Sequence, residues 1–505
     1  MKILNIIITA LIMISNSNSQ DAYQPDKIAF RPPTVAGAFY PADSLNLKKM
    51  LDTMFVLEKP FDLSKRNIIG MVVPHAGYVY SGKVAGKAYR ELQGRHYDAI
   101  IIISPSHRKF FNFASVFNGD AYVSPLGVVN VDKELAKEIA AGKSNLVKYS
   151  IDGHDWRNGT PEHAIEVQIP FIQTALPDTP IVPIVMGSQD INTSDELMRS
   201  IVSAVKKLKR NVLLIASSDL SHYHSADSAR IIDEPLVKTF GRFDYYALQT
   251  QLNMGSFEAC GGGPIVVVMM AAEQLGGVIC IPVKYSHSGK TDAGKDNQDS
   301  VVGYFSGVIC SGRPEEAIRM PFVQEDDKQK LINAVKNEVE KVTLSKSDTD
   351  YAVEYIPTQY AMSLPAFVTI TKNKELRACI GHTFSTKQLW FEICESARLA
   401  ATSDDRFGPI KASELNKIEY EITILSRLRR LLDINQIKIG EDGLLIRYEN
   451  SQGLLLPQVA SERGWDTETF LRNLCMKAGL PKDTYKKSDA KIYYFKAVIV
   501  KSENK

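Results

Sequence analysis

The sequence predicts an α/β first domain, in which helices cover both faces of a mainly parallel sheet, followed by a separate α+β domain. Between about residues 31 and 309, short and continuously apolar runs alternate with amphipathic segments, a pattern typical of parallel strands that are buried on both faces. Beyond about residue 325 the expected strands no longer alternate regularly with helices. The 505 residues also exceed what one hydrophobic core usually supports, so at least two domains are expected.

The individual elements follow from the apolar periodicity. In the first domain we expect strands at Ile68–Val73, Ala99–Ile103, Ile181–Met186, Val212–Ala216 and Val278–Val283, and helices at Val131–Ala141 and Asp195–Leu208. In the second domain we expect a charged helix from about residue 325 to 342, strands at Ala366–Thr371 and Tyr420–Leu425, and a helix near Thr467–Ala478. The first domain then spans residues 28–311, a linker with glycine and proline spans 312–324, and the second domain spans 325–503.

The first twenty residues have the pattern of a secretory signal peptide. Lys2 precedes an apolar stretch from Ile3 to Ile14, and a small polar segment then ends at Gln20. The apolar stretch is shorter than the roughly 20 residues that a membrane-spanning helix needs, so no membrane span is expected. We therefore expect residues 1–20 to be removed and the protein to reside in the periplasm or outside the cell, with a cytoplasmic protein as the alternative.

Charge and cysteine usage exclude some classes of function. The formal net charge is +2 and no long basic stretch occurs, which argues against nucleic acid as a partner. The tightest basic cluster is Arg427, Arg429 and Arg430, which we expect at a solvated strand end. The six cysteines include no CxxC pair, so most should be buried small hydrophobes, and one or two could serve a metal or catalysis.

Three of the nine histidines lie within six residues after the ends of expected strands. His75 follows the first apolar run, His107 the second and His222 the fourth. Because the carboxyl ends of parallel strands open on one edge of a sheet, where ligands bind, these three side chains are expected to converge. A single histidine after a strand is more often a hydrogen-bonded loop residue, but three at one edge make that alternative weaker.

Cys260 is a further candidate ligand because it lies in a glycine-rich turn that precedes an expected helix. A helix N-terminus and exposed amides favour the thiolate form of a cysteine. The alternative is a structural cysteine, and the residues alone leave both open.

Several short distinctive motifs follow one another along the first domain. The last two are Cys260-Gly261 and Asp299-Ser300-Val301-Val302-Gly303-Tyr304. The earlier ones are Ala36-Gly37-Ala38-Phe39-Tyr40-Pro41, Pro74-His75-Ala76-Gly77-Tyr78, Ser104-Pro105-Ser106-His107, Glu162-His163-Ala164-Ile165-Glu166 and Ser217-Ser218-Asp219-Leu220-Ser221-His222. In this order they resemble the Memo family over about residues 31–309. In bacteria and archaea such proteins are component B of the AmmeMemoRadiSam system.

The resemblance implies a fold related to the extradiol (class III) non-haem iron dioxygenases and a metal ion bound by His75, His107 and Cys260. It also implies that His222 occupies the position of an acid/base histidine, with Asp219 beside it to orient the ring and raise its pKa. Glu162, His163 and Glu166 are expected to support the ligands from one face of a helix.

This ligand set resembles the facial triad of non-haem iron enzymes with sulfur in place of one carboxylate oxygen. The expected cofactor is therefore one metal ion, with Fe(II) favoured and copper or zinc as alternatives. The same replacement places dioxygenase activity in question.

Motifs of the second domain include Leu376-Arg377-Ala378-Cys379-Ile380-Gly381 and Ala400-Ala401-Thr402-Ser403-Asp404-Asp405-Arg406-Phe407. They resemble the AMMECR domain, component A of the same system, over about residues 325–500. Arg377, Cys379, Asp404 and Arg406 could line a pocket for an anionic ligand. The alternative is that Cys379 packs in the core and Arg406 pairs with Asp404 structurally.

Three functions are consistent with these features. The leading hypothesis is a metal-dependent oxidoreductase of dioxygenase-like type that acts on a small-molecule or peptide ligand. The second is a non-catalytic metal- or peptide-binding module. The third is an accessory to a reaction of a radical S-adenosylmethionine component of the same system, although an exported protein would be separated from such an enzyme.

Overall fold

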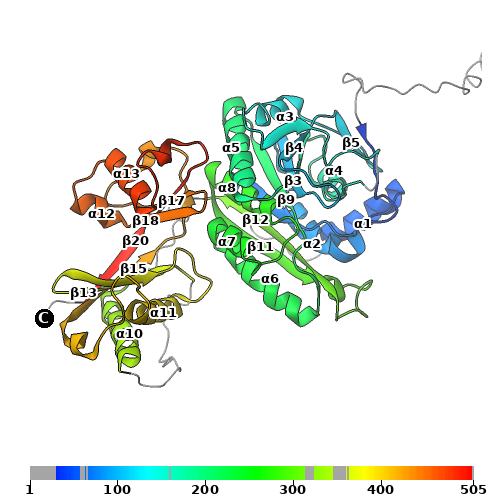
Figure 1. Ribbon diagram of the computed structural model, residues 1–505. Coiled ribbons are helices and arrows are strands. Elements are labelled where there is room, and N and C mark those ends of the chain that lie inside the picture. The colour runs from blue at the N-terminus through cyan, green and yellow to red at the C-terminus, as the bar shows by residue number, and fades with distance from the viewer. Residues whose placement is uncertain are drawn as a thin grey trace, which may run out of the picture.

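The structure, a computed structural model, describes residues 30–56, 63, 66–157, 161–312, 323–344, 360 and 363–502. The expected signal peptide at 1–20 and most of the expected linker at 312–324 lie outside the described residues. Figure 1 shows two domains, the first coloured blue to green and the second yellow-green to red. No helix within the described ranges is long and apolar enough to cross a membrane.

The first domain is built on a nine-stranded mixed sheet whose strands run in the order β10-β12-β2-β9-β3-β8-β4-β7, with β11 paired to β12. Four neighbouring central strands are parallel, as the apolar runs predict, and nearly all of their residues are buried. These strands are β2 (Ile68–Val73), β9 (Val212–Ser217), β3 (Ala99–Pro105) and β8 (Ile181–Met186). The flanking strands are β10 (His222–His224), β12 (Val301–Ser311), β4 (Ala114–Phe117) and β7 (Val147–Ser150).

The fifth expected strand is present but does not belong to the parallel set. It is β11 (Gly277–His287), which pairs antiparallel with β12, and β12 is in turn antiparallel to β2. A parallel pair needs a crossover that is usually an α-helix. The segment between β11 and β12, residues 288–300, contains the 3₁₀ turn η2 (Ser288–Lys290) but no α-helix, so the two strands form a hairpin. The sheet is therefore parallel at its centre and mixed towards its edges.

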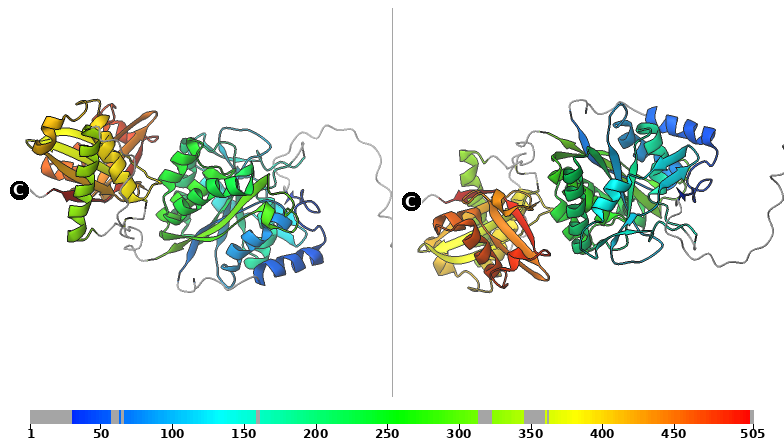
Figure 2. Two further views of the ribbon diagram at one scale, coloured as in Figure 1. Left: turned by 90° about the horizontal axis from the view of Figure 1, so that it is seen from below. Right: turned by 90° about the horizontal axis from the view of Figure 1, so that it is seen from above.

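Two groups of helices pack on this sheet (Figures 1 and 2). In the first group, α1 packs on α2 and α4, and α2 lies against β2, β11 and β12. In the second group, α8 packs on β2, β3 and β9 and contacts α5 and α7. The first group is α1 (Ser44–Val56), α2 (Tyr78–Arg90) and α4 (Ile169–Ala175), and the second is α3 (Lys133–Ile139), α5 (Ile191–Leu208), α6 (Ala226–Gly241), α7 (Tyr245–Asn253) and α8 (Gly262–Gln274). A small separate sheet holds β1 (Phe30–Arg31), β5 (Ala121–Ser124) and β6 (Gly127–Asn130).

The second domain contains two four-stranded antiparallel sheets and lacks a regular βα alternation among its described residues. One sheet is β14 (Glu375–Gly381), β13 (Ala366–Lys372), β15 (Ile418–Leu425) and β20 (Ala497–Lys501). The other is β16 (Arg429–Arg430), β19 (Lys491–Phe495), β17 (Gly443–Tyr448) and β18 (Ser451–Leu455). The helices are α10 (Glu325–Thr343), α11 (Leu389–Thr402), α12 (Pro457–Glu462) and α13 (Thr467–Lys477). The expected helices and strands of this domain are all found.

The arginine cluster does not lie at a solvated strand end; it forms buried ion pairs between the two domains. Arg430 places Nε 2.7 Å from Oδ1 of Asp195 on α5, and both side chains are about 95% buried or more. Arg427 and Arg429 both contact Oε1 of Glu273 on α8, at 2.7 and 3.0 Å. The expectation of solvation was wrong because these charges meet carboxylates more than 150 positions earlier in the chain, which no local pattern reveals.

His154 is a buried histidine outside the sheet edge, and its hydrogen bonds fix a neutral ring. Its Nε2 donates to the Ser115 carbonyl at 3.0 Å, since that oxygen can only accept, so Nδ1 accepts from the Tyr122 hydroxyl at 2.7 Å. Burial lowers the pKa of His154 to about 3. When folding lowers the pKa of a histidine, the buried neutral ring stabilises the folded protein fully only above the usual pKa near 6.5. This contribution to the free energy of unfolding is lost as the pH falls towards the pKa of the folded state.

We therefore expect His154→Gln to be less stable than the wild type at pH 7.5, and the difference should narrow as the pH falls from 6.5 to 4. The difference in free energy of unfolding should shrink by up to about 1.4 kcal/mol per pH unit, because only the folded wild type must keep this imidazole neutral. Urea unfolding of the two metal-free proteins at a series of pH values measures it. A difference that stays constant over this range would contradict the assignment of the buried neutral ring.

Candidate metal centre

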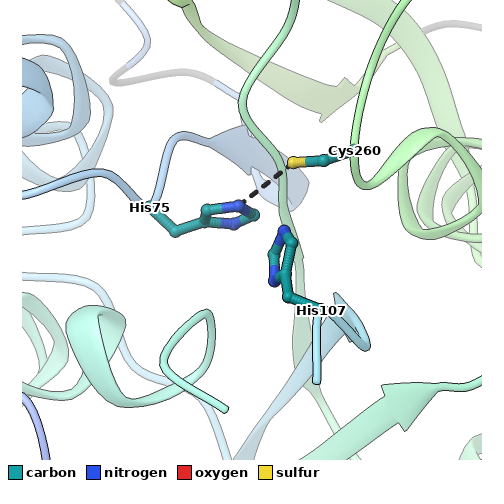
Figure 3. A group of neighbouring side chains, drawn as sticks. All are labelled: His75, His107 and Cys260. Carbon is teal, nitrogen blue, oxygen red and sulfur yellow. Dashed lines mark hydrogen bonds between the residues drawn. The ribbon is translucent and has the colours of Figure 1, made fainter. Parts of the chain in front are cut away.

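The carboxyl ends of β2 and β3 bring two histidines to the N-terminal loop of α8, where Cys260 lies (Figure 3). One nitrogen of His75, one nitrogen of His107 and the sulfur of Cys260 all lie within 4.8 Å of one another. The imidazole centroids of the two histidines are 5.0 Å apart and nearly perpendicular. The structure thus brings together the three residues that the sequence motifs single out as ligands.

A serine and a glutamine fix the ring of His75. Ser217 donates its hydroxyl hydrogen to the Ala164 carbonyl at 2.7 Å, so its oxygen must accept from Nδ1 of His75 at 2.9 Å. Gln168 donates to the same oxygen. His75 therefore carries its hydrogen on Nδ1, and the lone pair of Nε2 points at the sulfur of Cys260, 3.1 Å away. Burial lowers the pKa of His75 well below its usual value, which keeps this lone pair free. Sequence reasoning missed both supporting residues, and the serine at the end of β9 was the only local signal.

Glu162 supports His107 in a similar way. One carboxylate oxygen lies 3.0 Å from Nδ1 of His107, and the other accepts the backbone N–H of the same residue at 2.5 Å. These contacts direct Nε2 of His107 away from Glu162. A carboxylate on the far nitrogen of a histidine orients the ring and raises its basicity as a metal ligand.

Cys260 is held by backbone contacts at the end of its loop. The amide of Asp219 donates to the sulfur at 3.2 Å. Burial raises the pKa of the Cys260 thiol, and the nearby Asp219 carboxyl raises it further. This differs from the expectation that the helix N-terminus favours the thiolate, because burial outweighs the amide contact. The thiol hydrogen therefore bonds Nε2 of His75, and a cation would have to displace it.

His163 packs against both histidines without joining the cluster of three. Its ring is stacked on His107 with centroids 5.0 Å apart and meets His75 edge-on at 5.5 Å. Burial lowers its pKa to about 4, so the ring is neutral at pH 7. Together with Glu162 and His107 it forms a second group with ligand atoms in reach of one another.

Glu162 and Glu166 do not share a helical face, contrary to the expectation. The residues from 161 to 165 form no helix, and the 3₁₀ turn η1 (Glu166–Gln168) begins only at Glu166. Glu162 accepts the amides of the two residues that follow it, while the side chain of Glu166 points to the N-terminal segment. There it contacts Nη1 of Arg31 at 2.7 Å, the amides of Thr34 and Val35, and the Tyr40 hydroxyl.

Asp219 does not orient His222, which corrects a second expectation. The carboxylate of Asp219 accepts the backbone amide of His75 at 2.8 Å, and burial raises its pKa to about 7. The pKa of His222 is lowered rather than raised, because partial burial penalises the charged ring and the nearby His107 adds to this. The turn after β9 points the carboxylate back to the strand ends, although only two residues separate it from His222 in the sequence.

His222 faces a cavity of about 440 Å³ that also reaches Cys260. Its walls come from α7 and α8 and from the segment before α5, and they mix amide and apolar side chains. The polar or charged lining residues are Gln189, His222, Gln249, Asn253 and Glu258. Glu258 in turn pairs with His224, 2.9 Å away. The lining residues include no lysine or arginine that could pair with an anion.

In the second domain, the four candidate pocket residues lie together but satisfy one another and their neighbours. Arg406 contacts Asp404 through Nε and Nη2 at 2.8 and 2.7 Å, as the structural alternative expects. Arg377 is bound by Glu414 through two contacts of 3.0 Å and by two backbone carbonyls. Cys379 is half-buried and accepts from the Thr369 hydroxyl, so it is not a core residue.

A further group, His382, Glu392 and Glu395, also has ligand atoms within 4.8 Å of one another. Its carboxylates already have partners, since Glu392 contacts Nδ1 of His382 at 2.6 Å and Glu395 contacts Lys387 at 2.5 Å. Sequence reasoning missed this group because the histidine and the helix that carries both glutamates are separated by a turn. The existing pairs account for it without a cation.

Two family models match the chain. One, described as Memo-like protein, matches residues 31–308, and the other, described as AMMECR1, matches residues 331–500.

Curated relatives are similar in the same way. A MEMO1 family protein of Methanosarcina barkeri is 35% identical over 280 residues, which cover 55% of this chain and 99% of the relative. A MEMO1 family protein of Pyrobaculum aerophilum is 36% identical over 282 residues, which cover 55% of this chain and 97% of the relative. Among solved structures, an uncharacterized protein from Pyrococcus horikoshii is 29% identical, with a TM-score of 0.34, and the match covers 36% of this chain and 94% of that one.

Proposed function

Since the chain belongs to the Memo-like protein family and carries an AMMECR1 domain after its Memo domain, we propose that the Memo domain binds one metal ion through His75, His107 and Cys260 and acts as a metal-dependent oxidoreductase of dioxygenase-like type. The observation that carries the proposal is the convergence of the three ligand atoms within 4.8 Å at the edge of the sheet.

The donor set fits a transition metal. His75 turns an unprotonated imidazole nitrogen inwards because its other nitrogen donates to Ser217, and Glu162 orients the ring of His107 from behind. Two imidazoles and one sulfur suit iron, copper and zinc and do not suit magnesium or calcium, which prefer oxygen ligands. We favour Fe(II), by analogy with the facial triad, with copper and zinc as alternatives.

A catalytic role, rather than a purely structural one, is supported by the cavity. With three protein ligands, a bound redox metal would retain open positions at which oxygen or substrate could react. The cavity reaches Cys260 and is lined by His222, so a ligand in it would lie beside both. Its amide and apolar lining fits a neutral or cationic small molecule or peptide better than an anion.

The test begins with elemental analysis of protein that is purified anaerobically from cells grown with a full set of trace metals. The proposal predicts about one equivalent of iron, copper or zinc, and oxygen consumption with members of a panel of catechols when iron is bound. Stoichiometric metal without turnover would leave a metal- or peptide-binding module, or an accessory to a radical reaction, as the function. Protein that never retains a transition metal would contradict the whole proposal.

The role of His222 is that of a general base. Because burial keeps its pKa low, the ring is neutral at pH 7 and can accept a proton from a ligand in the cavity. We expect His222→Ala to retain bound metal but to lose turnover by about 10²- to 10⁴-fold. His96→Ala is the control, since His96 is an exposed histidine of the same domain that does not line the cavity. Turnover within a few-fold of the wild type in His222→Ala would remove the base from the mechanism.

We also propose that the protein is exported after removal of residues 1–20. The pattern of the N-terminal sequence supports this, and the intact mass of the native protein tests it. A native chain that retains Met1 in a cytoplasmic fraction would reverse the proposal.

A further inference from the structure

We propose that Arg427 and Arg430 of the AMMECR1 domain are positioning residues for the metal centre of the Memo domain. They hold α5 and α8, the two helices between which the loop of Cys260 is fixed. The inference rests on the proposed metal site, and it assigns the second domain a role in that site.

The loop of Cys260 is clamped by Gln189, which lies two residues before the start of α5. Gln189 donates to the Cys260 carbonyl at 2.8 Å and accepts the Gly263 amide at 2.8 Å. The loop has no room to shift: a Cβ atom on Gly261 would lie 2.4 Å from the Ser217 carbonyl oxygen, and one on Gly263 would lie 2.7 Å from Cβ of Gln189. The position of the sulfur therefore follows the N-terminal ends of α5 and α8.

The AMMECR1 domain holds the same two helices. On α5, Asp195 lies six residues after Gln189 and receives Nε and Nη2 of Arg430 at 2.7 and 3.2 Å. On α8, Glu273 lies near the far end, roughly 20 Å along the helix from Cys260 at 1.5 Å per residue, and receives Arg427. The side chain of Gln274 also donates to the Arg430 carbonyl.

A tyrosine links these contacts into one network. The Tyr245 hydroxyl on α7 donates to Glu273 at 2.7 Å and accepts the backbone amide of Arg430 at 2.6 Å. One helix turn later the cavity begins, since α7 supplies Gln249 and Asn253 to its wall. The helices that shape the cavity and hold the sulfur are thus those that the arginines contact.

The network is buried, so each charged side chain in it needs an oppositely charged partner. Asp195 and Glu273 are almost fully buried, and a buried carboxylate without its partner is strongly unfavourable. Loss of Arg430 leaves Asp195 with Arg199, 3.2 Å away on the next turn of α5. Loss of Arg427 leaves Glu273 with Arg429 and Tyr245. Each single variant therefore keeps a paired carboxylate, which favours folding, but loses a contact that fixes a helix.

The experiment compares the full-length wild type with Arg430→Gln, Arg427→Gln and the control Arg472→Gln. Arg472 lies on α13 of the same domain and pairs with Glu468, with both side chains substantially exposed. Two readouts are measured. One is the absorption of the cobalt(II)–thiolate bond on titration of metal-free protein with Co(II) alone. The other is the alkylation rate of Cys260 in the metal-free protein, followed by mass spectrometry of its peptide.

We expect Arg430→Gln to weaken cobalt binding at least tenfold, to lower the thiolate absorption per bound ion and to speed alkylation of Cys260 at least threefold. Arg427→Gln should change each quantity in the same direction, and Arg472→Gln should match the wild type. Folded Arg430→Gln and Arg427→Gln proteins with wild-type alkylation and cobalt spectra would overturn the inference. If Arg430→Gln does not fold, Arg427→Gln decides alone.

Failure of the proposed metal site is recognised separately. In that case the wild type and Cys260→Ser give the same cobalt spectrum. The alkylation rates then decide the inference: faster alkylation in the arginine variants still supports positioning of the thiol, and unchanged rates overturn it.

Discussion

His75→Ala is expected to lower the metal affinity of the Memo domain by more than about 100-fold. Removal of a residue that merely supports a ligand typically costs 10- to 100-fold, and His75 is proposed as a ligand itself. Its Nε2 is the donor that faces Cys260, and its ring is held from behind by Ser217, so the substitution removes one of the three proposed donors. Titration of the metal-free protein with the ion found in the wild type measures the loss.

The control for this variant is His96→Ala, because His96 is an exposed histidine of the same domain that lies outside the cluster. His96→Ala should bind metal as the wild type does. The His75→Ala protein should remain folded, since the histidine follows the end of β2 and contributes no part of the apolar core. A folded His75→Ala protein with a full complement of metal would eliminate His75 as a ligand.

Glu166→Ala is expected to destabilise the Memo domain by about 3–5 kcal/mol, the usual cost of breaking a buried ion pair. The carboxylate is fully buried and is the partner of Arg31, whose side chain is only 1% exposed. Its removal would leave the guanidinium without a carboxylate partner, with only two backbone carbonyls, the Thr34 hydroxyl and the Tyr122 ring, and would also release the Tyr40 hydroxyl. Urea unfolding followed by circular dichroism measures the change.

Glu134→Ala is the matched control, because Glu134 pairs with Arg210 at the surface and exposed pairs contribute at most about 1 kcal/mol. Below the urea concentration at which it unfolds, Glu166→Ala should still bind metal, since Glu166 contacts the N-terminal segment and none of the three ligands. A loss of stability below about 1 kcal/mol would show that the N-terminal segment is held by other contacts.

Much of the candidate site could be predicted, because its residues follow strands that local patterns reveal. His75 and His107 each lie within four residues after a continuous apolar run, and parallel strands must present their carboxyl ends at one edge. Cys260 was ambiguous from its residues alone, since a cysteine before a helix is often structural. The assignment of Cys260 as a ligand depended on the order of the motifs around it.

The remaining features depend on contacts between distant segments. Asp219 is close to His222 in sequence, yet its carboxylate binds the amide of His75, which depends on the path of the turn after β9. The cluster that begins at Arg427 resembles a surface patch in sequence, because its partner Glu273 lies in the other domain. Hydrophobic periodicity predicts which face of an element is buried but carries no information on which charges meet across an interface.

The position of the arginines near the end of the chain also determines when the interface between the two domains can form during synthesis. Arg429 and Arg430 form β16, which pairs with β19 at Tyr494 and Tyr493, so this edge exists only once nearly the whole chain has been made. At typical rates of translation, roughly ten to forty seconds separate the completion of β12 from that of β19. Until β19 is made, the newly made Memo domain carries Asp195 and Glu273 without the paired strand β16 that holds Arg430 in place, so the last step of assembly is the closure of the interface that holds α5 and α8.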